Sequence, residues 1–365
     1  MNEFLSGKKS NSSNRGNSFV RDYLSFVFKD PEIALRGFRG RDNNDLKDID
    51  KVIEPPKPQL ETSEFEDLKC KNKFKNRVMK FWFVMNANFD QETLKNLRNN
   101  IKSVKIVFNN HSYEEYKGLY DPDDNMIILK KGYLEQILFH ELFHMASSLR
   151  RIFLSKVGGF RIISNNFLSI GEGLDEGYTD NMMYKFFYEK NRIHPNYVIR
   201  YPYEFLISRA LDYVIGKETM EKLYLKASLH GLINELLKYT SKESIDEFLK
   251  VTDNAMSKEQ DALNNEGTKY EKIITMERRK EYIRHFLLEI FYNKYSSCDD
   301  FDDKLNEYSN ILTMELEREY EIKNPLSQGL TFKKKKEPKV RTTRFKITDR
   351  EYINDFMQSK KRLTK

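Results

Sequence analysis

Apolar side chains recur at spacings of three and four between residues 132 and 151, and this recurrence is the strongest constraint on the fold. Side chains at such spacings share one face of an α-helix, so the pattern predicts a helix over residues 132–151 with one buried face. His140 and His144 stand on a different stripe, with Glu141 beside it, which leaves these residues available for chemistry. The apolar members of the pattern are Leu134, Leu138, Leu142, Met145 and Leu149.

The segment that carries these residues reads His-Glu-Leu-Phe-His over 140–144, which is the pattern H-E-x-x-H. Histidines four residues apart in a helix have Cβ atoms about 5–6 Å apart, so both imidazoles can reach one metal ion. Zinc binds imidazole nitrogen at about 2.0–2.1 Å and lowers the pKa of the water it binds to about 7. Glu141 is placed to accept a proton from that water and to pass it to a leaving amine. The ordinary alternative is a pair of structural histidines, although the chain has only six.

A catalytic zinc ion usually has three protein ligands, so a third is expected downstream. Residues 171–180 read Gly-Glu-Gly-Leu-Asp-Glu-Gly-Tyr-Thr-Asp. With H-E-x-x-H, this segment resembles the gluzincins, the thermolysin-like clan of zinc metallopeptidases, whose second motif is N-E-x-x-S/T-D. The resemblance implies that Glu176 is the third zinc ligand and that Asp180 accepts a hydrogen bond from a ligand histidine. Glu176 and Asp180 are one helical turn apart, so both face the same way.

This second motif contains one departure from the family pattern and leaves two alternatives open. Asp175 departs from the family pattern, in which asparagine is commoner at this position. Glu172, one turn before Glu176, is the nearest rival ligand. A solvated helix face is the ordinary explanation for the carboxylates of Glu176 and Asp180.

The resemblance rests on about 40 residues around the two motifs, within a similar stretch from 73 to 190. It implies that a strand within residues 104–129 lines the cleft and pairs with an extended substrate. It also implies a donor that stabilises the oxyanion. Tyr201 is the preferred candidate for that donor, and an ordinary packing role is the default for any tyrosine in this chain. The rival donors are Tyr203, Tyr184 and His230.

We expect an α+β, mostly helical fold of zincin-like type, in which a small mixed sheet from about 78 to 129 packs on the zinc helix beside a second, all-helical lobe. The low counts of Gly (15) and Pro (9) favour helix. A flexible extension is expected over 1–72, a metallopeptidase domain over 73–325, with lobes at 73–173 and 174–325, and a basic tail over 326–365. Helices are expected at 174–189, 203–215, 218–239, 243–251, 270–295 and 300–322.

Charge and cysteine content bear on location and partners. The net charge of +7 comes from residues 333–365, where thirteen Lys or Arg stand against four Asp or Glu. The four-lysine run 333–336 is typical of a solvated tail, and contact with nucleic acid or an anionic surface is the alternative. Cys70 and Cys298 form no disulfide framework. Residues 1–21 contain no apolar signal core and no apolar run is long enough to cross a bilayer, which favours the cytoplasm, although signal-independent export leaves no sequence mark.

These patterns favour a zinc-dependent peptidase that acts on a peptide or protein substrate, with zinc on His140, His144 and Glu176 and with Glu141 as the general base. The alternative is a catalytically degenerate zinc protein that serves as a binding module, its basic tail contacting nucleic acid or an anionic surface. Cleavage preference, endo- or exopeptidase action, a pro-segment role for residues 1–72 and the oligomeric state stay open.

Overall fold

The structure, a computed structural model, describes residues 72–109, 118–130, 135–152, 155–164, 169–189, 199–253, 270–321 and 340–363. These residues are mostly helical and carry small sheets, so the expected α+β, mostly helical class is confirmed. Residues 1–71 of the expected extension and the lysine run 333–336 lie outside the described residues.

Two helices precede the first sheet. In α3 (Asn72–Asn88), the buried side chains of Phe74, Val78, Phe81 and Met85 recur at spacings of three and four. This is helical periodicity, so the expectation that strands begin near residue 78 is wrong. The shorter α4 (Lys95–Ile101) follows a turn in which Asp90 accepts a hydrogen bond from the backbone N–H of Thr93 at 2.7 Å. Asp90 therefore caps the turn before α4, whose own N-cap residue is Leu94.

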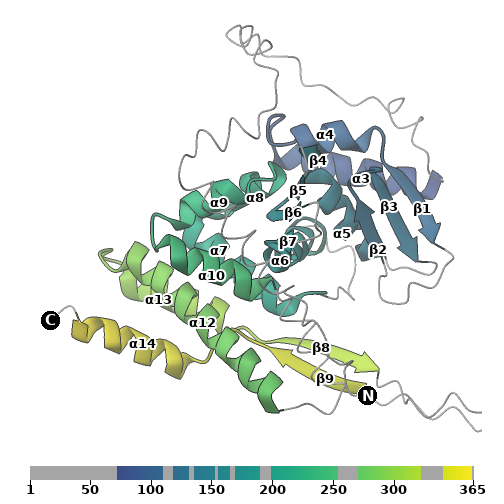
Figure 1. Cartoon of the computed structure of the whole chain (residues 1–365). Helices are drawn as coiled ribbons and strands as arrows, with labels where there is room; N and C mark the ends of the chain where they lie inside the picture. The colour runs from purple at the N-terminus through teal and green to yellow at the C-terminus, as the bar shows by residue number, and fades with distance from the viewer. Residues whose placement is uncertain are drawn as a thin grey trace, which may run out of the picture.

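The first sheet is small and mixed, as expected. Its strands are β1 (Lys105–Asn109), β2 (Gly118–Asp121) and β3 (Met126–Lys130), in the order β1-β3-β2. β3 pairs parallel with β1 and antiparallel with β2. β2 is therefore an edge strand, and Figure 1 shows that it lies on the side of the sheet nearest α5 and α6.

The zinc helix is shorter than expected. α5 spans Glu135–Ala146, and Ser148–Ile152 forms strand β4 instead of two further turns of helix. Asn100 supplies a reason, because its side-chain amide donates to the carbonyl oxygens of Met145 at 2.9 Å and Ser148 at 2.7 Å and so caps the end of α5. Leu149, expected on the buried face, is 38% exposed.

A second sheet of four strands was not expected from the sequence. β4 pairs with β5 (Ser155–Gly158), β5 with β6 (Arg161–Ser164), and β6 with β7 (Ser169–Ile170), all antiparallel. Gly159 turns the chain between β5 and β6 with a φ of +51°, a conformation that favours glycine.

A helical lobe that begins with α6 follows, and Figure 1 shows it on the opposite side of α5 from the first sheet. Two of the expected helices end early. The helix expected over 218–239 is broken near Ala227, whose φ is +54°, and the one expected over 300–322 gives way to strand β8. The observed elements are α6 (Glu172–Met183), the π-helical turn η3 (Tyr184–Glu189), α7 (Pro202–Ile215), α8 (Lys217–Leu225), α9 (Leu229–Leu236), α10 (Lys242–Thr252), α12 (Tyr270–Tyr295) and α13 (Phe301–Leu312).

The C-terminal segment, expected as a tail, packs on this lobe. β8 (Leu316–Glu321) pairs antiparallel with β9 (Val340–Phe345), and α14 (Arg350–Leu363) follows. Phe345 is 1% and Ile353 2% exposed, so the segment contributes to the core. No helix among the described residues combines the length and apolar character needed to span a membrane.

Candidate metal centre

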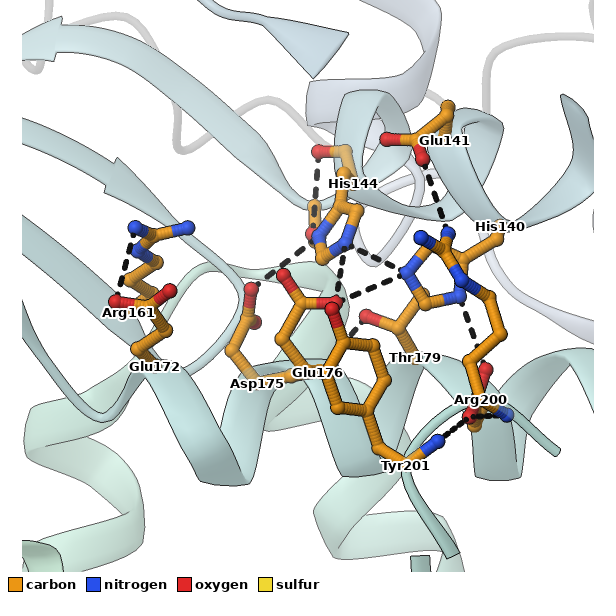
Figure 2. A network of polar contacts seen from close by, with 12 residues as sticks. His140, Glu141, His144, Arg161, Glu172, Asp175, Glu176, Thr179, Arg200 and Tyr201 are labelled. Atoms are coloured by element: carbon orange, nitrogen blue, oxygen red, sulfur yellow. Dashed lines mark hydrogen bonds and ion pairs between the residues drawn. The ribbon is translucent and has the colours of Figure 1, made fainter. Parts of the chain in front are cut away.

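α5 brings three polar side chains into an apolar interior. His140 is 1% and Glu141 3% exposed, and most of their neighbours along the helix are fully buried. His144 lies one turn after His140, on the same face. Figure 2 shows both imidazoles pointing toward the carboxylate of Glu176. Buried polar groups are costly without hydrogen-bond or charged partners, so these three side chains need partners within the site.

α6 carries the opposite side of the site. Glu176 and Asp180, one turn apart, face α5 as expected. Two glycines let α6 approach its neighbours: a Cβ on Gly173 would lie 2.0 Å from the carbonyl oxygen of Thr252, and a Cβ on Gly177 would lie 2.4 Å from that of Glu204. Both obstacles are backbone, so the glycines on either side of Glu176 fix the depth at which α6 sits.

Three ligand atoms form a compact triangle. Nε2 of His140 lies 3.1 Å from Nε2 of His144 and 3.1 Å from Oε2 of Glu176. The third side of the triangle, from Nε2 of His144 to Oε2 of Glu176, is 3.6 Å. Ligands about 2.0–2.1 Å from a tetrahedral zinc ion lie about 3.3–3.4 Å from one another. The three side chains therefore fit zinc in number, type and spacing, and they are the group among the described residues that can hold a metal ion.

Each histidine has a carboxylate behind it. Nδ1 of His140 lies 3.0 Å from Oδ1 of Asp180, and Nδ1 of His144 lies 3.2 Å from Oδ2 of Asp175. A carboxylate only accepts, so each Nδ1 carries hydrogen and each Nε2 presents its lone pair to the triangle. Three lone pairs converge at close range, and this arrangement needs a cation or a proton between them.

The charges of the cluster agree with that need. Burial opposes a positive charge on His144, but Glu176 and Asp175 overcome it and raise its pKa well above the usual value. Burial also opposes a negative charge on Glu176, but the two histidines overcome it and hold the pKa of Glu176 well below its usual value. The carboxylates of this buried site therefore favour a positive charge on the histidines or between the ligand atoms.

Glu141 lines the same cavity as the triangle. Nη1 of Arg200 is 3.4 Å from its Oε1. On the other side, a Cβ on Gly118 of β2 would lie 3.0 Å from that same oxygen, so the glycine leaves room for the carboxylate. Neither Arg200 nor Gly118 was singled out from the sequence, because both reach Glu141 from distant segments.

Tyr201, the oxyanion donor preferred from the sequence, lines the cavity, and its three rival candidates do not. Its ring centroid is 6.1 Å from that of His140, and burial raises its pKa well above the usual value, so the hydroxyl keeps its proton. The rivals lie elsewhere. Tyr184 packs edge-on against Phe205, Tyr203 is buried in the core of the helical lobe, and His230 contacts the Asn234 amide at 3.1 Å.

A cavity of about 310 Å³ joins these groups. α5 and α6 contribute the metal-binding residues, β2 contributes Gly118, Leu119 and Tyr120, and the β5–β6 hairpin lies on its wall as well. Glu172, the rival ligand, also lines the cavity, but its carboxylate is 3.2 Å from Nη2 of Arg161 and stays out of the triangle. Figure 2 shows this pair beside the metal-binding residues.

Comparisons with protein-family models, with curated protein sequences and with solved structures found no match to this chain. The resemblance to the gluzincins is therefore carried by the two short motifs, and a function has to be argued from the geometry of the cavity.

Proposed function

We propose that the protein is a zinc-dependent peptidase of gluzincin type, with a zincin-like arrangement of sheet, zinc helix and helical lobe. The observation that carries the proposal is the meeting of a zinc-sized ligand triangle with Glu141 and Tyr201 in one cavity. A purely structural zinc site is usually closed by four protein ligands, whereas three ligands and an adjacent carboxylate are typical of catalysis.

The side chains have distinct roles in this proposal. A bound zinc ion would supply a Lewis acid that acidifies water and polarises a carbonyl group. Glu141 accepts the proton of the attacking water and delivers it to the amine nitrogen of the leaving group. Arg200 orients Glu141 through the 3.4 Å contact. The protonated hydroxyl of Tyr201 donates a hydrogen bond to the oxyanion that forms when water attacks the peptide carbonyl.

Strand β2 supports a peptide as the substrate. It is one of the two edge strands of its sheet in the described structure, and Gly118, Leu119 and Tyr120 line the cavity. An edge strand offers unpaired backbone groups, and an extended peptide can add to it as a further strand. Leu119 is 47% exposed, which leaves an apolar side chain on this edge for a substrate to cover.

Metal content and cleavage measured side by side test the proposal. We expect about one zinc ion per chain in the wild type, the same zinc content but no cleavage of an unfolded protein in Glu141→Gln, and weak zinc binding in Glu176→Ala. A wild type that binds no zinc would rule the proposal out. Zinc binding with equal cleavage by wild type and Glu141→Gln would show that the site is not the catalyst.

A further inference from the structure

The β5–β6 hairpin presents one face to the cavity. Lys156 pairs with Ile163 and Gly158 with Arg161 across the two strands, and alternation along each strand puts all four on the same side. All four line the cavity. The side chains of Val157 and Ile162 alternate to the opposite face, where they are 6% and 4% exposed and belong to the core, and Val157 also contributes to the cavity wall. The orientation of the cationic face is therefore fixed by the pairing of the strands.

Arg161 is held in place along one edge of its guanidinium group. Nε donates to Oγ of Ser169 at 3.0 Å, and Nη2 lies 3.2 Å from the carboxylate of Glu172. Within the described parts of the chain, no hydrogen bond or ion pair engages Nη1, and the side chain is 28% exposed. Gly158, the cross-strand partner of Arg161, has no side chain to cover this group. A guanidinium fixed in this way is preorganised to bind a planar anion.

Glu172 positions Arg161. It lies on the same face of α6 as Glu176, one turn earlier, yet it is engaged by Arg161 and not by the metal-binding triangle. This pairing connects the hairpin to the helix that carries Glu176, so Arg161 keeps a fixed place relative to the proposed metal ion.

Apart from the candidate metal ligands, Asp175 that contacts His144, and the Glu141–Arg200 pair, the cavity wall carries two cations and one anion. The cations are Lys156 and Arg161, and the anion is Glu172. Asp123, which pairs with Lys156 at 2.6 Å, is not among the residues that line the cavity. A cationic substrate group would meet both positive charges here, whereas an anionic one would meet complementary charge.

We propose that this hairpin face is a substrate subsite for a carboxylate, with Arg161 as its main donor and Lys156 as a second cation. The inference rests on the proposed peptidase function and names its substrate class: a peptide with a carboxylate near the scissile bond. That carboxylate is either the side chain of Asp or Glu or the free C-terminus of the peptide. Both offer the two oxygens that a guanidinium group binds side by side.

Binding to zinc-loaded Glu141→Gln tests the subsite, because this variant is expected to hold peptides without cleaving them. The probes are fluorescent octapeptides with a blocked N-terminus and one common sequence. The reference peptide is C-terminally amidated and neutral. One arm replaces a Gln with Glu at each position in turn, and the other arm leaves the C-terminus as a free carboxylate. At least one arm should bind about fivefold to tenfold tighter than the reference, as expected for a charge-assisted hydrogen bond at a partly exposed site.

The second half of the test substitutes the hairpin in the Glu141→Gln background. Adding Arg161→Gln should remove the difference in binding affinity between the anionic and the neutral peptides. Adding Lys156→Gln should reduce that difference. Arg344→Gln is the matched control, because Arg344 also pairs with a glutamate, Glu317, at 2.9 Å, and lies outside the cavity. It should leave the difference unchanged.

Two results would overturn the subsite. Equal binding of all peptides would show that no carboxylate is recognised. A preference that survives both hairpin substitutions would place the carboxylate elsewhere, for example on the metal ion. Cleavage is not read in this experiment, so the two proposals fail separately: a carboxylate preference that depends on Arg161, found alongside a wild type that cleaves nothing, would support the subsite and count against the peptidase.

Discussion

Asp180 holds His140 through a 3.0 Å contact between Oδ1 and Nδ1, and its other oxygen, Oδ2, accepts the backbone N–H groups of Arg200 and Tyr201 at 2.7 and 2.8 Å. The carboxylate is 0% exposed. One side chain therefore orients His140, a candidate metal ligand, and also fixes the start of α7, where Tyr201 enters the cavity.

Replacing Asp180 with Asn should weaken zinc binding about 10–100-fold, the range usual for loss of a group that orients a ligand histidine. An amide has only one acceptor oxygen, so its NH₂ group would face either His140 or the two backbone N–H groups. Competition with a chelator measures the affinity.

Asp175→Asn is the matched comparison for this change. Oδ1 of Asp175 accepts one backbone N–H, from Phe160 at 2.9 Å, where Oδ2 of Asp180 accepts two. We expect a smaller loss of zinc affinity in Asp175→Asn than in Asp180→Asn. The reverse order would mean that His144, and not His140, limits the affinity.

Gly177→Ala should destabilise the protein by about 1–3 kcal/mol or more, because the new methyl group would overlap the backbone at Glu204, which cannot move aside as a side chain can. Zinc content should fall with it, since Glu176 is the adjacent residue. Gly158→Ala is the control: its Cβ would lie 3.6 Å from Cα of Ser148, an ordinary contact. Urea denaturation compares the two, and equal stabilities would show that α6 and α7 are not in tight contact.

The candidate metal site could be predicted from the sequence because its parts are local. His140 and His144, and likewise Glu176 and Asp180, are one helical turn apart, so helix geometry alone places each pair on one face. The triangle is completed only when α5 and α6 pack against each other. The sequence indicated this packing only through its resemblance to the gluzincins.

The features that the sequence did not indicate depend on contacts between distant segments. Arg200 reaches Glu141 across 59 residues. β4 forms where helical periodicity continues through Leu149, because β5 supplies a strand partner and Asn100 caps α5. Asp175 was noted only as a departure from the asparagine of the family pattern, although its place beside Glu176 was a signal for a role at His144.

The stability of the protein should depend on Asp253, which connects α10 to the start of α6. Its carboxylate accepts the backbone N–H of Gly171 at 2.9 Å, and burial raises its pKa to about 7, against the lowering effect of the backbone hydrogen bonds. The folded state thus holds this proton more tightly than the unfolded state, in which the pKa is near 3.8. The contribution of Asp253 to stability is therefore greatest below pH 4 and decreases as the pH rises to 7.

Comparison with Asp253→Asn isolates that effect. The free energy of unfolding of the wild type minus that of the variant should decrease by about 1.4 kcal/mol for each pH unit between the two pKa values, and level off above pH 7. Urea denaturation of metal-free protein between pH 4 and 8 measures it, and other titrating groups cancel in the difference. A difference that does not vary with pH would mean that Asp253 is ionised throughout.

Tyr201→Phe separates catalysis from metal binding. The change removes only the hydroxyl, so zinc content and folding should match the wild type, while kcat should fall about 10²–10³-fold with little change in KM, as for loss of one oxyanion donor. Tyr203→Phe is the control, because Tyr203 is two residues away and does not line the cavity; its kcat should stay near that of the wild type. An unchanged kcat in Tyr201→Phe would assign the oxyanion contact to another group, and Arg200 would be the first to examine, because it lines the cavity beside Glu141.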